Sequence, residues 1–262
     1  MKKLPPLFCL CLLSAASVQA AVEESFDMAV VNGGLANFAN QGVWTINDPT
    51  VDQSFIQQGS AYGAPGNSVG LGGFYSEPVG NTVRLSTVVS EALAGARFTA
   101  DFALVNRYAG GTGFFFPDDD RFGFVLSDSA GEFLNIDFNP TTTEDIRRVF
   151  VNGSGLSPNG VLASDYNTPR WYTMTIDFIN NGSDLDYSLN IAGGAITNMG
   201  TLFGRANAVL TGIGIDYDVR GAVAGSNYIV VDNIAIPEPT VTLTGLMAAG
   251  LLAGRRRRQV VC

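Results

Sequence analysis

Residues 170–189 read RWYTMTIDFINNGSDLDYSL. In their first half, large apolar residues alternate with mostly polar ones: Tyr172, Met174, Ile176 and Phe178 against Trp171, Thr173, Thr175 and Asp177. An apolar–polar period of two predicts a β-strand with one face in the core and the other toward solvent. Asn181-Gly182 interrupts the run, and a second alternating run starts at Leu185. Because Asn-Gly between two such runs favours a tight turn, the stretch predicts a β-hairpin.

The same period recurs along much of the chain, in the runs Phe98–Leu104, Phe122–Leu126, Tyr187–Ile191 and Ile213–Tyr217. Residues that favour turns bound these runs, among them Gly110-Gly111, Asn152-Gly153 and Gly193-Gly194. Between the two ends of the chain, no stretch sustains the 3.6-residue period of an amphipathic helix. Short strands without helices predict an all-β fold, either a sandwich or a barrel.

Three segments add detail to this fold class: Glu24-Ser25-Phe26-Asp27 near the start, residues 170–178 in the middle, and Ile229–Ile234 (IVVDNI) near the end. Their layout resembles that of concanavalin A-like and laminin G-like domains. The resemblance implies a single antiparallel jelly-roll sandwich over residues 21–234, with a galactose-binding-like sandwich as the alternative. No Pro-rich tract, charge run or internal repeat divides this range, whose length is usual for one all-β domain.

The first 20 residues have the composition of a secretory signal peptide. Lys2 and Lys3 precede an apolar run from Leu4 to Ala16, and Val18-Gln19-Ala20 places small residues before a cleavage site at Ala21. We therefore expect residues 1–20 to be removed on export.

The tail combines three elements in order: Pro237-Glu238-Pro239, an uncharged apolar run from Val241 to Gly254, and the cluster Arg255, Arg256, Arg257 and Arg258. Arginines beside an apolar helix stay on the cytoplasmic side, so this tail would orient the rest of the chain outward. The run is shorter than the roughly 20 residues of an ordinary membrane span. The two prolines favour an extended, unpaired backbone that a protease could bind.

This order of elements resembles the PEP-CTERM sorting signal. The resemblance implies that residues 235–258 form a sorting signal with a short transmembrane helix, processed by exosortase in bacteria that make exopolysaccharide. It also implies transfer of the domain from the inner membrane to the cell surface or the extracellular space. A plain C-terminal membrane anchor is the alternative.

Without its two ends, the chain has no cysteine, because Cys9, Cys11 and Cys262 all lie outside residues 21–236. That range holds nine arginines against 23 acidic residues and no lysine, a formal net charge of −14. Such a surface repels nucleic acid and anionic lipid headgroups. The chain also lacks histidine, so few of the usual nucleophile–base pairs can be formed.

Four predicted strands each carry an aspartate between apolar residues: Asp101, Asp137, Asp177 and Asp216. If neighbouring strands aligned them, their carboxylates would form an acidic site for sugar hydroxyls or cations. The alternative is that each aspartate belongs to the solvent-facing side of its own strand, as half-buried strands require. We favour this second interpretation and keep Asp101, Asp137 and Asp177 as candidate ligand-binding residues.

Glu132 and Asp137 are the nearest match to the paired carboxylates of jelly-roll glycosidases. Retaining chemistry needs two carboxyl groups about 5–5.5 Å apart. The two positions differ by five, and an odd spacing puts two side chains on opposite faces of a regular strand. We therefore predict no catalytic residues and no enzymatic activity.

Aromatic rings that stack on a sugar are expected in loops. Trp44, Tyr62, Tyr75 and Tyr108 lie in Gly- and Asn-rich contexts and are the candidate platforms, with packing in the core as the default for any single one of them. Trp171, at a strand start, is assigned to the core. Ca²⁺ is the one candidate cofactor. The jelly-roll resemblance implies that an ion could clamp the termini through Glu24 or Asp27 together with Asp232, since Ca²⁺ takes carboxylate oxygens.

The predicted function is carbohydrate binding by an exported surface or matrix protein, with exosortase as processing partner and exopolysaccharide as ligand. A structural extracellular protein without a specific ligand is the alternative. A glycoside hydrolase or lyase comes third.

Overall fold

The computed structural model describes residues 20–24, 44–47, 54–57, 68–72, 80, 82–106, 121–138, 149–152, 154–156, 170–191, 196–218 and 227–237. In these ranges the chain forms strands β1 to β15, arranged as a sandwich of two antiparallel sheets. The all-β sandwich predicted from the period-two pattern is thus confirmed. Within the same ranges, no helix is long and apolar enough to span a membrane.

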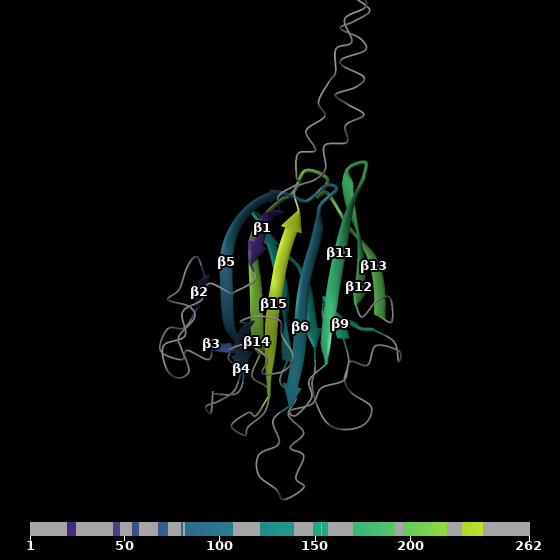
Figure 1. Ribbon diagram of the computed structural model, residues 1–262. Helices are drawn as coiled ribbons and strands as arrows, with labels where there is room; N and C mark the ends of the chain where they lie inside the picture. The colour runs from purple at the N-terminus through teal and green to yellow at the C-terminus, as the bar shows by residue number, and fades with distance from the viewer. Residues whose placement is uncertain are drawn as a thin grey trace, which may run out of the picture.

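Sheet A has the strand order β13-β12-β11-β6-β15-β4-β3, with β1 paired to the end of β15. Its strands are β1 (Ala20–Glu24), β3 (Ser54–Gln57), β4 (Ser68–Gly72), β6 (Arg97–Asn106), β11 (Trp171–Asn181), β12 (Asp184–Ile191), β13 (Ile196–Leu202) and β15 (Asn227–Pro237). Figure 1 shows β15, β6 and β11 running side by side through the middle of the view.

Sheet B has the strand order β10-β9-β8-β7-β14-β5-β2. Its strands are β2 (Trp44–Ile46), β5 (Thr82–Ala92), β7 (Arg121–Asp128), β8 (Gly131–Phe138), β9 (Val149–Val151), β10 (Ser154–Gly155) and β14 (Val209–Asp218). The chain crosses from sheet B to sheet A between β5 and β6 and returns between β6 and β7. These consecutive strands therefore belong to opposite layers of the sandwich.

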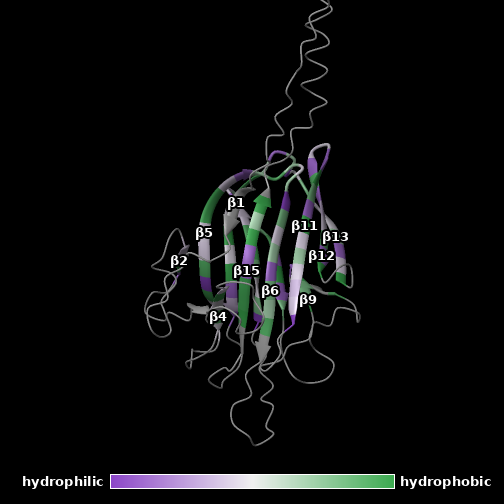
Figure 2. Ribbon diagram, in the orientation of Figure 1, coloured by the Kyte–Doolittle hydropathy of each residue, from purple (hydrophilic) through white to green (hydrophobic). Residues whose placement is uncertain are grey.

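The hairpin predicted within residues 170–189 is confirmed as β11 and β12. Asn181 pairs with Asp184, so the loop consists of Gly182 and Ser183 alone. Gly182 has φ +69°, a left-handed conformation that glycine adopts without a Cβ penalty. The alternation also holds, since buried residues alternate with partly exposed or exposed ones from Trp171 to Phe178 of β11 and along all of β12. Figure 2 shows both hydrophobic and hydrophilic segments along β15, in the middle of the same sheet.

Aromatic side chains from both sheets fill the core. The Phe102 ring of sheet A stacks on the Phe138 ring of sheet B at 4.5 Å, and it meets the Phe124 ring edge-on at 6.0 Å. Phe122 and Tyr217 stack at 4.9 Å within sheet B. Burying one such side chain stabilises a fold by about 1.5–3 kcal/mol. In a domain without cysteine, this packing joins the two layers.

The ends of the described chain lie together. β1 pairs with β15 from Glu24 opposite Ile234 to Ala20 opposite Pro237. The domain boundary predicted at residue 234 therefore falls inside β15. Pro237 is extended, as expected, but its backbone lies in a ladder rather than unpaired. Cleavage before Ala21 would remove Ala20, the residue that pairs with Pro237. The backbone of Pro237 would then be unpaired in the processed chain.

Candidate functional site

Charged and polar side chains gather on the outer face of sheet B, the side turned away from the core. On β14, Ile213, Ile215 and Tyr217 belong to the core, so the side chains between them point outward. The set considered below, the sheet B array, comprises Arg84 on β5, Arg121 on β7, Glu132 and Asp137 on β8, Phe150 on β9, and Asp216 on β14.

Glu132 belongs to the array because β8 contains a bulge. The ladder between β7 and β8 shifts register between Leu126 and Ser127, and Ser127 pairs with Glu132. The shift leaves Phe133 as an extra residue, and its side chain is buried in the core. One extra residue reverses the alternation of side chains beyond it. Glu132 and Asp137 therefore share the outer face, and the prediction that they lie on opposite faces was wrong.

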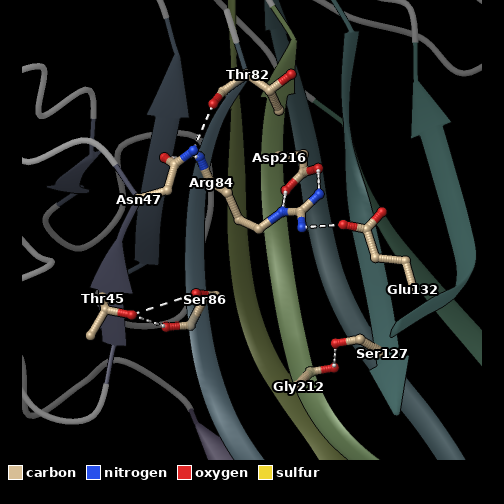
Figure 3. A network of polar contacts seen from close by, with 9 residues as sticks. All are labelled: Thr45, Asn47, Thr82, Arg84, Ser86, Ser127, Glu132, Gly212 and Asp216. Atoms are coloured by element: carbon tan, nitrogen blue, oxygen red, sulfur yellow. Dashed lines mark hydrogen bonds and ion pairs between the residues drawn. The ribbon is translucent and has the colours of Figure 1, made fainter. Parts of the chain in front are cut away.

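Arg84 is the centre of the array. Its Nε and Nη2 donate to Asp216 Oδ1 and Oδ2, each at 2.6 Å, and its Nη1 forms an ion pair with Glu132 Oε1. Figure 3 shows the guanidinium lying between these two carboxylates, which come from β14 and β8. The side chain of Asp216 is only 7% exposed, whereas that of Glu132 is 49% exposed. Arg84 thus links a buried carboxylate to one that solvent reaches.

Glycines make the close approach in the array feasible. A Cβ on Gly214 would lie 3.1 Å from Cδ of Arg84, so the aliphatic part of Arg84 lies directly over the β14 backbone. Gly123 stands in register between Asp216 and Asp137. A Cβ there would lie 2.3 Å from the carbonyl oxygen of Ile136. Any side chain at Gly123 would therefore have to displace backbone rather than a mobile side chain.

Arg121 organises the other end of the array. Its Nη1 lies 3.9 Å from Asp137 Oδ2, and its Cζ lies 4.0 Å from the centroid of the Phe150 ring. A guanidinium over an aromatic face is attracted by the ring quadrupole. The array thus presents two guanidiniums, three carboxylates and one aromatic ring, and each guanidinium is fixed in direction by two contacts.

The electrostatics of the array follow from its burial. Burial raises the pKa of the Asp216 carboxyl, and the Arg84 guanidinium opposes this without cancelling it. The hydrogen bonds to Asp216 in turn raise the pKa of Arg84, which therefore stays charged. Taking a charge out of water costs free energy unless a partner compensates it. The charges of Asp216 and Arg84 accordingly compensate each other as a buried ion pair, and Glu132 contacts the same guanidinium from the solvent side.

A second polar group lies on the outer face of sheet A. Asp101 accepts hydrogen bonds from Thr173 Oγ1 at 2.6 Å and from Asn233 Nδ2 at 2.9 Å. Asp101 also stands directly opposite Asp232, which is buried and accepts from the backbone N–H of Asn233. Asn233 has φ +49° and lies where the β15–β6 register shifts. This irregularity turns its side chain toward Asp101.

Asp177 is the remaining predicted ligand-binding aspartate. It forms an ion pair with Arg97, whose Nε lies 2.6 Å from Asp177 Oδ1, and this hydrogen bond raises the pKa of Arg97. Asp101 and Asp177 lie on sheet A, whereas Asp137 lies on sheet B. The three candidates therefore do not form a single site. Only Asp137 and Asp216 stand level with each other, with Gly123 between them, whereas Asp101 is opposite Thr173 and Asp177 is opposite Arg97.

Of the two tryptophans, Trp44 lies in the core and Trp171 lies outside it. Trp44 is 2% exposed and packs in the core, so its ring offers no face to a sugar. Trp171 is half-buried, and its neighbour Tyr172 points into the core. Trp171 therefore belongs to the outer face of sheet A, beside Thr173. The alternation of residues 171–178 already indicated this side, and assigning Trp171 to the core was wrong.

Several candidates lie outside the described residues: Tyr62, Tyr75, Tyr108, Asp27, Glu238, Pro239 and Arg255 to Arg258. For the calcium hypothesis, the backbone of Glu24 lies opposite Ile234, two residues from Asp232. Among described side chains, no three acidic or thiol groups gather closely enough to hold a metal ion. The Glu24–Asp27–Asp232 clamp therefore stays a prediction.

Comparison with known proteins places the fold among the legume-lectin-like, or concanavalin A-like, sandwiches. No protein-family model and no curated protein matches the sequence. The metal-free carbohydrate recognition domain of Emp46p matches the structure with a TM-score of 0.50 at 9% identity, over 84% of this chain and 98% of that one. At this identity the match shows the fold alone.

Two plant lectins match with lower scores. Peanut lectin gives a TM-score of 0.43 at 12% identity, over 82% of this chain and 96% of that one. Lectin II from Ulex europaeus gives 0.42 at 12% identity, over 84% and 99%. The match to the Emp46p domain confirms, at the level of fold, the concanavalin A-like sandwich expected from the sequence.

Proposed function

We propose that this domain binds carbohydrate through the sheet B array. The observation that carries the proposal is the β8 bulge, which brings Glu132 onto the same face as Asp137, Asp216 and the two arginines. Oriented carboxylates accept hydrogen bonds from sugar hydroxyls and guanidiniums donate them. A fold shared with a carbohydrate recognition domain agrees with this assignment.

The array favours binding over hydrolysis. A glycosidase needs one carboxyl group that stays protonated as general acid and a second that acts as base or nucleophile. Here Arg84 contacts both Asp216 and Glu132, and Arg121 lies beside Asp137. Each of these contacts holds a carboxylate oxygen against a guanidinium as a hydrogen-bond or ion-pair partner. These contacts suit acceptors of fixed direction, which is what recognition of hydroxyls requires.

A glycan array probed with the full chain and with two variants tests the proposal. Glu132→Gln removes the exposed carboxylate of the array, and Asp177→Asn is the matched control on the other sheet. We expect wild type and Asp177→Asn to bind the same glycans and Glu132→Gln to lose binding at least about tenfold, since hydrogen bonds to charged groups contribute about 1.5–3 kcal/mol. No glycan binding by wild type would favour the structural alternative.

An EDTA arm in the same experiment tests the calcium hypothesis separately. If an ion held by Glu24, Asp27 and Asp232 supports the domain, EDTA lowers glycan binding and Ca²⁺ restores it. Binding that is unchanged in EDTA would remove calcium from the proposal and leave the sheet B array in place.

We also propose that the protein is exported and that exosortase processes its tail. The basis is the order of Pro237-Glu238-Pro239, apolar run and arginine cluster, together with the signal-peptide pattern of residues 1–20. The protein would be held in the inner membrane and then reach the surface, with exopolysaccharide as its ligand. Mass spectrometry of the mature protein should find a C-terminus upstream of Arg255; an intact Cys262 on it would contradict the proposal.

A further inference from the structure

The charges on the outer face of sheet B do not balance. The sheet B array contains two guanidiniums and three carboxylates. A fourth carboxylate belongs to the same face, because Asp218 follows the core residue Tyr217 on β14 and stands opposite Arg121. These six groups have a formal charge of −2, in a domain whose net charge is −14 and which has no lysine. Such a face attracts cations and repels anions.

Glu132 is the most exposed carboxylate of the array. Its side chain is 49% exposed, against 16% for Asp137 and 7% for Asp216. One oxygen of Glu132 pairs with Arg84, and Figure 3 shows the other oxygen turned away from that guanidinium. Arg84 is shared with Asp216, to which it donates two hydrogen bonds. It therefore compensates the charge of Glu132 only in part.

Asn135 adds a neutral acceptor to the same face. Its neighbours Leu134 and Ile136 lie in the core, so its side chain points outward, between Glu132 and Asp137 along β8. Its Oδ1 is buried, and among the described residues no donor lies within hydrogen-bond distance of it. A buried acceptor without a donor costs free energy. A ligand that brings a donor to this point removes that cost.

The outer face of β8 thus presents a row of acceptors, the β8 row, made of Glu132, Asn135 and Asp137. In the ladder with β7, Glu132 is level with Ser127 and Asp137 with Gly123. Four residues of a strand span about 13 Å, which is longer than one sugar ring. The row therefore suits consecutive units of a polymer rather than a single sugar.

Among the substituents that sugars carry, a protonated amine fits the β8 row best. A carboxylate or sulfate on the sugar would be repelled by the acidic face. Hydroxyl and acetamido groups donate hydrogen bonds but carry no charge. An ammonium has three N–H donors and no acceptor. Its hydrogen bonds to carboxylates are charge-assisted and roughly twice as strong as those between neutral groups.

We propose that the ligand of the sheet B array is a polysaccharide with free amino groups, which bind as ammonium along β8 between Glu132 and Asp137. This inference rests on the proposed carbohydrate binding and names the class of sugar. The two can fail separately, because a neutral glycan can occupy the array without any amine.

Three oligosaccharides of equal length and the same linkage test the inference. Oligomers of chitosan, chitin and cellulose differ only in the substituent on the second ring carbon, which is an amine, an acetamide or a hydroxyl. Calorimetric titration of the full chain, at a pH that keeps the amine protonated, gives the three affinities. We expect the chitosan oligomer to bind at least about tenfold more tightly than the other two. Added salt should weaken its binding most, because salt screens the charges.

Glu132→Gln and Asp177→Asn separate the β8 row from the diffuse field of the acidic domain. Each variant removes one negative charge, and each lost carboxylate pairs with an arginine at a similar exposure, 49% for Glu132 and 37% for Asp177. An attraction to net charge alone would therefore fall equally in both. We expect Glu132→Gln to weaken chitosan binding at least about tenfold and Asp177→Asn to leave it nearly unchanged.

Circular dichroism checks that the variants fold, and Asp137→Asn, at the other end of the row, provides a second loss of binding. Equal losses in Glu132→Gln and Asp177→Asn would overturn the site. A wild type that binds the chitin or cellulose oligomer more tightly, or binds other glycans but not chitosan, would overturn the amine alone. A wild type that binds no glycan would overturn the proposed function as well.

Discussion

At the scale of single residues, Arg84 and its two carboxylates show how burial decides the energetic weight of a contact. Both acids contact the same guanidinium, but Asp216 is 7% exposed and Glu132 is 49% exposed. An exposed ion pair contributes little because water solvates both charges. A buried carboxylate that loses its cation is left uncompensated. The two partners of Arg84 should therefore differ sharply in what their loss costs.

Arg84→Met should lower the free energy of unfolding by about 3 kcal/mol, since it leaves Asp216 buried without a cation. Glu132→Gln should lower it by less than about 1 kcal/mol. Urea denaturation at pH 7 measures both. Equal losses would show that the exposed pair matters as much as the buried one.

The Arg84→Met defect should also depend on pH. Burial already raises the pKa of Asp216 in the folded state, and losing Arg84 raises it further. The pKa of this carboxyl is then higher in the folded state than in the unfolded state, where it is about 3.9. The free energy of unfolding therefore falls as pH rises from the unfolded-state pKa to the folded-state pKa. The variant should therefore approach wild type as pH falls from 7 toward 4. Denaturation midpoints at several pH values check this, and a deficit independent of pH would contradict it.

Gly123 is the residue at which the array depends most on the absence of a side chain. Gly123→Ala should destabilise the fold by about 1–3 kcal/mol, because the new Cβ meets the backbone oxygen of Ile136. Gly214→Ala is the matched comparison and should cost less, since the atoms it meets belong to the flexible Arg84 side chain. Thermal unfolding of the two variants compares them directly.

At the scale of elements, the hairpin of β11 and β12 and the bulge of β8 show the two ways in which a strand sets side-chain direction. The hairpin follows its local sequence: the turn comes at the predicted Asn181-Gly182 signal, with Gly182 and Ser183 as its two loop residues, and the ladder is unbroken. The bulge at Phe133 follows a non-local demand, because both Phe133 and Leu134 enter the core. The bulge places Glu132 on the outer face of sheet B, within the candidate site.

Gly182→Ala should destabilise the domain by about 1 kcal/mol. Nothing lies within 4 Å of the added Cβ, so the cost comes from holding φ +69° alone. Ser183→Ala, at the neighbouring loop position, is the control and should be nearly neutral. Chemical denaturation of the two variants gives the comparison; equal stability of both would mean that the turn tolerates an L-residue at 182.

At the scale of the whole molecule, two sheets without a cysteine between them depend on aromatic packing. Phe102→Ala should cost about 3–5 kcal/mol, because it removes the ring that joins Phe138 and Phe124 across the two layers. Val209→Ala, at an exposed position on β14, should change little. Calorimetry of both variants measures the difference, and a small effect of Phe102→Ala would contradict a shared core.

The sequence by itself determined the all-β class, the strands around residues 98, 122, 172, 187 and 213, and the hairpin at Gly182, because period two and turn residues are local properties. The alternation of residues 171–178 also indicated that Trp171 points away from the core. The tertiary structure alone decided which strands are neighbours, and so which sheet receives Asp137 and which receives Asp101. It also decided that Phe133 bulges, that Trp44 is buried, and that β13 ends a sheet. Strand pairing and burial depend on contacts between residues far apart in the chain. The alternation along one strand is local and therefore predicts neither of them.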